Sequence, residues 1–210
     1  TQQLKVRMAY RFDFIFSNLM RLFMIAANIL MIQLIFDKVT AINGWGFWEV
    51  LWVYGFASSS IALVYPFANG IFMMPELVIS GEFDSFLIRP VSPVFQVFLR
   101  DTREDWLIVV FIRLGIFVVA SLNAFTYWTF AGVVVTVFFF FCSLIINLAI
   151  FVVLGAMAFR YYQIQPLYWL YLGSIYDLAY WPLSVFSKPL QIFLTCVRPL
   201  AFVSIVPAEA

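Results

Sequence analysis

The segment from residue 129 to residue 158 constrains the fold most, because it is long enough to cross a lipid bilayer and contains no charged side chain. The whole chain of 210 residues has the same character, with 65% hydrophobic and 11% charged residues. A soluble domain carries about 25% charged residues. A core in so short a chain cannot bury this much apolar surface, whereas a bilayer solvates the outside of each helix. The sequence therefore predicts an all-α integral membrane protein.

Five apolar runs in the chain approach or exceed the length of about 20 residues that a membrane-spanning helix requires. They cover residues 14–36, 49–72, 106–122, 129–158 and 167–186. Neither an internal repeat nor a low-complexity linker separates these runs. Residues 13–210 are therefore predicted to form a single transmembrane domain.

Basic residues indicate which ends of these runs face the cytoplasm. Those near the first run and in the linker between the second and third runs are Lys5, Arg7, Arg11, Arg21, Arg89, Arg100 and Arg103. The loops expected on the opposite side, residues 37–48 and 123–128, carry Lys38 as their one basic residue. By the positive-inside rule, the N-terminus and the linker are predicted to be cytoplasmic.

Composition also excludes several classes of function. The net charge of +1 gives no basic field that would attract nucleic acid. The chain has no histidine, and Cys142 and Cys196 have neither paired nor metal-ligand spacing. The phosphate-binding motif Gly-x-x-x-x-Gly-Lys-Ser/Thr does not occur, so this chain is not expected to bind ATP itself. No catalytic, cofactor-binding or metal-ligating residue is predicted.

The linker at residues 74–103 is the one sizeable polar segment of the chain. Its apolar residues recur at helical spacing and its charged residues face elsewhere, which predicts a short amphipathic helix. The apolar residues are Phe83, Phe86 and Leu87, and the charged ones are Glu82, Asp84 and Arg89. Gly81 is expected to end the preceding helix and Pro90 to stop this one. The helix would fit a groove on another protein or lie on lipid head groups, and the pattern leaves both open.

Charged residues inside or beside the apolar runs are costly in a membrane and often functional. Arg113 and Asp177 lie at broadly similar depths in the third and fifth runs, which allows a buried ion pair. Independent snorkelling or water exposure is the alternative. Glu49 begins the second run beside Trp45 and Trp48. This grouping indicates an interfacial aromatic belt, or else a part of an outer gate.

Two further patterns concern how the helices are arranged. Gly55, Ser58, Ser59 and Ala62 place small residues four apart in the second run, which lets a neighbouring helix approach closely. After the fifth run, the apolar pieces within residues 187–206 are too short to cross a bilayer and are interrupted by prolines. They indicate outer re-entrant helices or a loop on the outer surface.

The linker motif resembles that of a known family of membrane proteins. Ile79-Ser80-Gly81-Glu82-Phe83-Asp84, followed by Leu87-Ile88-Arg89-Pro90, is similar to the cytoplasmic signature of type-2 ABC exporter permeases, also called ABC-2-type permeases. Gly44-Trp45 before Glu49, the region from Tyr180 to Pro182, and Arg198-Pro199 to Pro207 are similar as well. The resemblance covers essentially the whole chain.

This resemblance implies a six-span exporter bundle, of which about five spans and the outer re-entrant helices are present here. It also implies a second permease chain, identical or homologous, and two cytoplasmic ABC ATPase subunits that hold ATP and Mg²⁺. The chain itself would be non-catalytic and would lie in a bacterial-type plasma membrane among its lipids. The sixth span does not follow Pro207, so we expect it in a longer protein.

The resemblance further implies roles for particular segments. Residues 1–12 would form a cytoplasmic interfacial amphipathic helix, and residues 74–103 the coupling linker to the ATPase. The coupling residues would be Gly81, Glu82, Phe83, Asp84, Phe86, Leu87, Arg89 and Pro90. The aromatic, largely uncharged spans favour an amphipathic or hydrophobic passenger. The alternative function is a stand-alone secondary transporter or channel that uses Arg113 and Asp177.

Overall fold

The computed structural model describes residues 2–100, 106–124, 129–161, 163–175 and 177–196. Within these residues the chain folds into helices joined by turns, with no β-sheet. The four long helices are α1 (Gln2–Phe36), α2 (Phe47–Phe72), α6 (Leu107–Ala124) and α7 (Phe130–Met157). Each of the four includes an apolar stretch long enough to cross a membrane, so the first four predicted runs correspond to candidate spans in the described part of the chain. The prediction of an all-α fold is confirmed for the described residues.

The fifth predicted run, residues 167–186, differs from the prediction of one continuous helix. It contains α8 (Gln165–Trp169), a π-helical turn η2 (Leu170–Ile175) and two short 3₁₀ turns, η3 (Leu178–Tyr180) and η4 (Leu183–Val185). Trp181 is extended, with φ −117° and ψ 145°, as expected for a residue before a proline. Pro182 therefore interrupts the helix before it reaches the predicted end.

The first helix includes most of the predicted N-terminal segment. α1 runs without a break from Gln2 to Phe36, so residues 2–12 are helical and continuous with the candidate span Phe14–Phe36. The last described helix, α9 (Lys188–Cys196), occupies the first part of the predicted re-entrant segment. The remainder of that segment lies outside the described residues.

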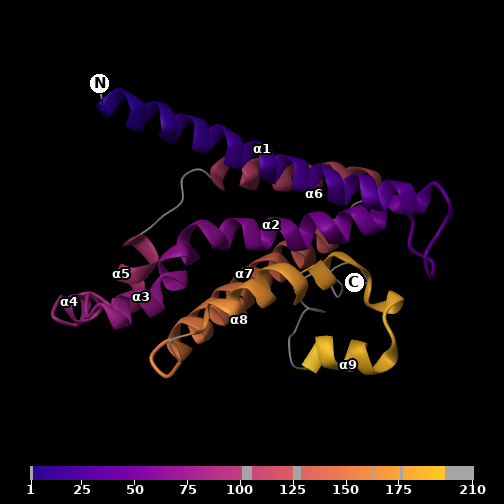
Figure 1. The fold of residues 1–210 in the computed structure, drawn as a ribbon. Coiled ribbons are helices and arrows are strands. Elements are labelled where there is room, and N and C mark those ends of the chain that lie inside the picture. Colours follow the sequence, from indigo (N-terminus) through magenta and orange to yellow (C-terminus); the bar gives the residue numbers. More distant parts are fainter. Residues whose placement is uncertain (1, 101–105, 125–128, 162, 176, 197–210) are drawn as a thin grey trace.

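α2 forms the centre of the molecule. In Figure 1, α1 and α6 lie on one side of α2, and α7 and α8 lie on the other. α2 contacts α6 most extensively, followed by α7, and also packs against α1, α5 and η3. Its side chains are buried along most of its length, whereas few side chains in the apolar spans of α1, α6 and α7 are fully buried. The exposed apolar side chains of these three helices form a surface suited to lipid.

Small and aromatic residues explain the close contact between α2 and α6. A Cβ atom at Gly55 would lie 2.8 Å from the Cα atom of Phe117, so only glycine fits at this crossing. The rings of Phe56 and Phe117 lie 5.5 Å apart and meet edge to face, and Phe140 of α7 lies 5.4 Å from Phe56. The prediction that small residues of the second run allow close approach is confirmed at Gly55. Edge-to-face aromatic pairs then hold the three helices together.

Three short helices fill the predicted linker. α3 (Met74–Ile79) follows α2 after one residue, and α4 (Asp84–Leu87) and α5 (Pro93–Arg100) come next. Figure 1 shows α3, α4 and α5 together at one end of the molecule, with α4 outermost. We call residues 80–92, which include α4, the tip.

Candidate functional site

The tip begins with a tight turn at Gly81. The amide of Ser80 donates to the carbonyl of Glu76 at 2.9 Å, and the amide of Phe83 donates to the carbonyl of Leu77 at 3.0 Å. Gly81 has φ +76°, in the left-handed region where a side chain is strained. These bonds satisfy carbonyls at the end of α3, as in common helix C-caps. The prediction that Gly81 ends the helix is confirmed.

The apolar residues of the tip separate into buried and exposed groups. Phe86 is only 7% exposed, and its ring lies 6.2 Å from that of Phe83. Phe83 in turn packs edge to face against Phe159 at 4.8 Å, just after α7. Leu87 and Ile88 are 58% and 85% exposed. The expectation that Phe86 shares an exposed face with Leu87 is wrong, because Phe86 packs inward with Phe83 and Phe159 whereas Leu87 points outward.

Polar contacts brace the tip against α5. Arg100 forms an ion pair of 2.7 Å with Glu82, and its guanidinium also lies 5.8 Å from the centre of the Phe86 ring. The side-chain amide of Gln96 donates to the backbone carbonyl of Phe86 at 3.1 Å and to that of Val91 at 2.7 Å. Of the other predicted coupling residues, Asp84, Arg89 and Pro90 are exposed. The guanidinium of Arg89 also lies 5.8 Å from the centre of the Phe86 ring.

A polar cavity of about 360 Å³ lies between the tip and the end of α2. Its lining residues are Asn69, Met73, Glu76, Leu77, Ser80, Glu82 and Arg100. The cavity lies next to the Arg100–Glu82 ion pair. Among the described residues, no group of three or more histidine, cysteine, aspartate or glutamate side chains is placed to hold a metal ion.

Arg113 turns inward from α6 toward the central helix. One of its terminal nitrogens donates to the backbone carbonyl of Ser58 on α2 at 3.2 Å. Its guanidinium also interacts with the hydroxyl of Tyr180 through a side-chain hydrogen bond. A charge near the middle of a span costs about 2.5–3.5 kcal/mol on insertion scales. This arrangement excludes snorkelling as the explanation for Arg113.

The predicted ion pair between Arg113 and Asp177 is not formed. Both residues are described, and no contact within 4.0 Å joins their charged groups. Asp177 follows the π-helical turn and is exposed. It is still near enough to Arg113 for the two charges to interact electrostatically. The broken fifth run accounts for the difference, because the predicted depth of Asp177 assumes a regular helix.

Glu49 has a structural contact at the start of α2. Its carboxylate accepts a hydrogen bond of 2.7 Å from the amide of Gly46, the residue before the helix begins. Trp45 is half-buried, and Trp48 is 39% exposed. The loop before α2 is further held by Asn43, whose side-chain amide donates to the carbonyl of Ser184 at 2.8 Å.

A second polar cluster, inside the bundle, was not predicted. The side-chain amide of Asn147 on α7 donates to the hydroxyl of Ser60 on α2 at 3.3 Å. The hydroxyl of Tyr171 donates to the side-chain oxygen of Asn147 at 2.7 Å. Asn147 is the one amide in a long apolar run, and that position was the available signal.

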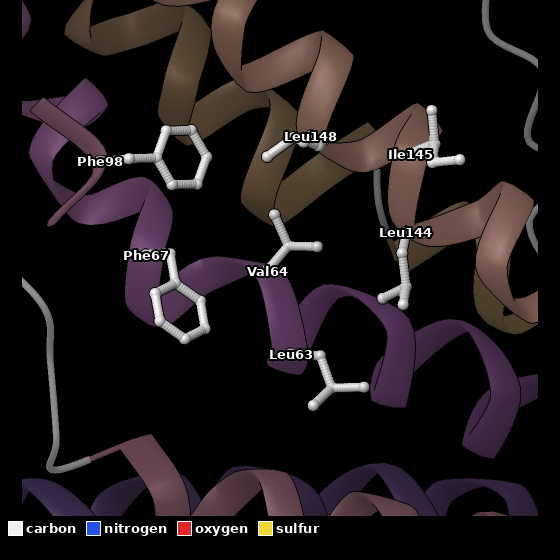
Figure 2. A pocket seen from close by; sticks show the side chains of 7 residues that line it. All are labelled: Leu63, Val64, Phe67, Phe98, Leu144, Ile145 and Leu148. Atoms are coloured by element: carbon white, nitrogen blue, oxygen red, sulfur yellow. The ribbon is translucent and has the colours of Figure 1, made fainter. Parts of the chain in front are cut away.

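An apolar cavity of about 190 Å³ opens between α2, α5 and α7. Figure 2 shows its lining side chains, all of them apolar: Leu63, Val64, Phe67, Phe98, Leu144, Ile145 and Leu148. Because no lining side chain carries a polar group, the cavity suits hydrocarbon rather than water.

A family model described as ABC-2 family transporter protein matches residues 22–210. The chain belongs to the ABC-2 family of transporter proteins. The match includes the tip, the environment of Arg113 and both cavities. A search of curated proteins and a search of solved structures each found no match. The ABC-2 family assignment and the four apolar helices together establish a multi-pass membrane protein with a role in transport.

Proposed function

We propose that this ABC-2 family protein is the membrane-spanning permease of an ATP-driven exporter, in which a separate cytoplasmic ATPase hydrolyses ATP. The observation that carries the proposal is the family match together with the exposed apolar pair Leu87 and Ile88 at the end of the tip. Two adjacent apolar residues on a polar, braced turn are suited to a groove on a partner protein.

The contacts of the tip support a role in transmitting motion. Phe83 packs against Phe159 beside α7, and α3 directly continues α2. The Glu82–Arg100 ion pair joins the tip to α5. A displacement of Leu87 and Ile88 by the ATPase would therefore reach the central helix and α7 through packed side chains.

The complete transporter is proposed to contain two permease chains, identical or homologous, and two ATPase subunits that bind ATP and Mg²⁺. Each permease would have six spans, with the N-terminus and tip on the cytoplasmic side of a bacterial-type plasma membrane. The apolar cavity between α2 and α7 supports an amphipathic or hydrophobic passenger. This chain would contribute no catalytic residue.

Affinity purification of the full-length protein from its native membrane in mild detergent tests this proposal. We expect a P-loop ATPase to co-purify in equal numbers with the permease. Leu87→Asp and Ile88→Asp should each reduce the amount of ATPase recovered, because a charge would enter an apolar groove. Phe130→Asp, which changes a side chain that is 85% exposed at the opposite end of α7, is the control.

Recovery of the chain without an ATPase, under conditions that preserve other ABC complexes, would contradict the proposal. It would instead favour the stand-alone secondary transporter, whose coupling groups would be Arg113 and Asp177. A thermal unfolding measurement in the same detergent checks that each variant is folded, so that a loss of ATPase recovery reports on binding and not on unfolding.

A further inference from the structure

The guanidinium of Arg113 lies inside the bundle, and one of its buried N–H donors has no hydrogen-bond partner. Arg113 lies six residues after the start of α6, about 9 Å along the helix axis. Its side chain points to α2, where one terminal nitrogen binds the carbonyl of Ser58. A guanidinium carries five N–H donors and no acceptor. Its buried Nε–H has no hydrogen-bond partner.

The hydroxyls of two tyrosines, Tyr54 and Tyr180, lie near this guanidinium. The ring of Tyr54 lies 4.8 Å from that of Tyr180, which is hydrogen-bonded to Arg113. Tyr54 is only 1% exposed, and its hydroxyl has no hydrogen-bond partner. Buried polar atoms in proteins are nearly always paired. An unpaired Nε–H and an unpaired hydroxyl beside one guanidinium indicate that an acceptor group belongs here.

We propose that Arg113, together with the hydroxyls of Tyr54 and Tyr180, binds the oxyanion of an amphipathic molecule, a phosphate or a carboxylate. Such groups offer several lone pairs and match the planar donor geometry of a guanidinium. The exposed apolar side chains of α6 and α7 would accommodate the hydrocarbon part. Calling the bound molecule the passenger rests on the proposed export function, whereas the binding itself does not.

The effect of Asp177 on binding distinguishes an oxyanion site from a purely structural pairing of Arg113 and Asp177. Its carboxylate is near enough to interact electrostatically with Arg113 but does not pair with it. A negative charge there opposes an incoming anion, so removing the charge should strengthen binding. If Arg113 and Asp177 served only to stabilise one another, removal of either charge would be damaging.

Equilibrium binding of radiolabelled dodecyl phosphate to the full-length protein in phosphatidylcholine nanodiscs tests the site. We expect Arg113→Gln to weaken binding by about tenfold or more and Arg113→Lys to weaken it less. Tyr54→Phe should weaken binding by a few fold and Asp177→Asn should strengthen it. Arg21→Gln is the matched control, because Arg21 lies 4.7 Å over the ring of Trp106 elsewhere in the bundle.

Competing ligands distinguish the sources of the oxyanion. Competition by phosphatidylglycerol in the nanodisc would identify a membrane lipid as the occupant, and competition by inorganic phosphate would identify a free anion; either result supports the oxyanion site. Equal binding to the wild type and to a folded Arg113→Gln variant would overturn it, as would equal affinity for dodecylamine.

A loss of binding in Asp177→Asn as large as that in Arg113→Gln would also overturn the proposal. Neither ATPase nor ATP is present in this measurement. A failure of the oxyanion site is therefore distinguishable from a failure of the exporter proposal.

Discussion

The hydroxyl of Tyr171 donates a hydrogen bond of 2.7 Å to the side-chain oxygen of Asn147, which joins the π-helical turn after α8 to α7. Asn147 also binds Ser60 of α2, so one amide connects three parts of the bundle. Hydrogen bonds between membrane helices contribute about 0.6 kcal/mol on average and up to about 1.7 kcal/mol.

A double-mutant cycle measures this connection. We expect Asn147→Leu and Tyr171→Phe each to lower the free energy of unfolding in detergent, with a coupling between them of about 0.6–1.7 kcal/mol. Tyr161→Phe, at an exposed tyrosine just beyond α7, is the control and should change little. Strictly additive losses would show that the hydrogen bond contributes nothing to stability.

The crossing of α2 and α6 depends on the absence of a side chain at Gly55. Gly55→Ala places a Cβ atom against the backbone of Phe117, and we expect overpacking to cost about 1–3 kcal/mol. Gly115 lies on α6 in open space, so Gly115→Ala should instead stabilise by about 0.5–1 kcal/mol. Thermal unfolding of both variants tests this, and equal effects would contradict the assigned packing.

The ion pair between Glu82 and Arg100 should be important for holding the tip rather than for global stability. Both side chains are partly exposed, and such pairs contribute about 0.2–1 kcal/mol. We expect Glu82→Arg to reduce ATPase recovery through like-charge repulsion and the double variant Glu82→Arg/Arg100→Glu to restore it. Lys188→Glu on α9 is the control. No recovery in the double variant would show that the charges act separately.

Glu49 allows a direct choice between a structural and a gating role. Its carboxylate binds the amide of Gly46, and loss of a helix cap costs about 0.5–2 kcal/mol. Glu49→Ala should therefore destabilise the protein, whereas Glu49→Gln keeps an acceptor and should be nearly neutral. If Glu49→Gln is stable but loses transport in reconstituted vesicles, the charge itself serves the outer gate.

Features with strong local causes could be predicted from the sequence. The apolar runs up to residue 158 and the helix end at Gly81 depend on hydropathy and on a backbone preference that one residue sets. The inward direction of Phe86 could not be predicted, because it depends on packing with Phe83 and, through it, Phe159, a tertiary contact that local helical spacing does not specify.

The environment of Arg113 depended on tertiary structure in the same way. Its pairing with Asp177 assumed a regular helix through the fifth run, and the π-helical turn and Pro182 remove that regularity. The contacts of Arg113 with Ser58 and Tyr180 depend on how α6 and η3 pack against α2, which the sequence does not specify. Polar residues inside spans were recognisable, but their partners were not.

Because α3 follows α2 after one residue, the two helices together are longer than the hydrocarbon core of a bilayer is thick. The apolar helical path from Phe47 to Ile79 contains 33 residues, which at 1.5 Å per residue corresponds to about 50 Å. The hydrocarbon core of a bilayer is about 30 Å thick. Either this path is strongly tilted or about 20 Å of it stands clear of the hydrocarbon. An upright helix whose excess length lies at the α3 end would place Leu87 and Ile88 beyond the lipid head groups, within reach of a water-soluble protein.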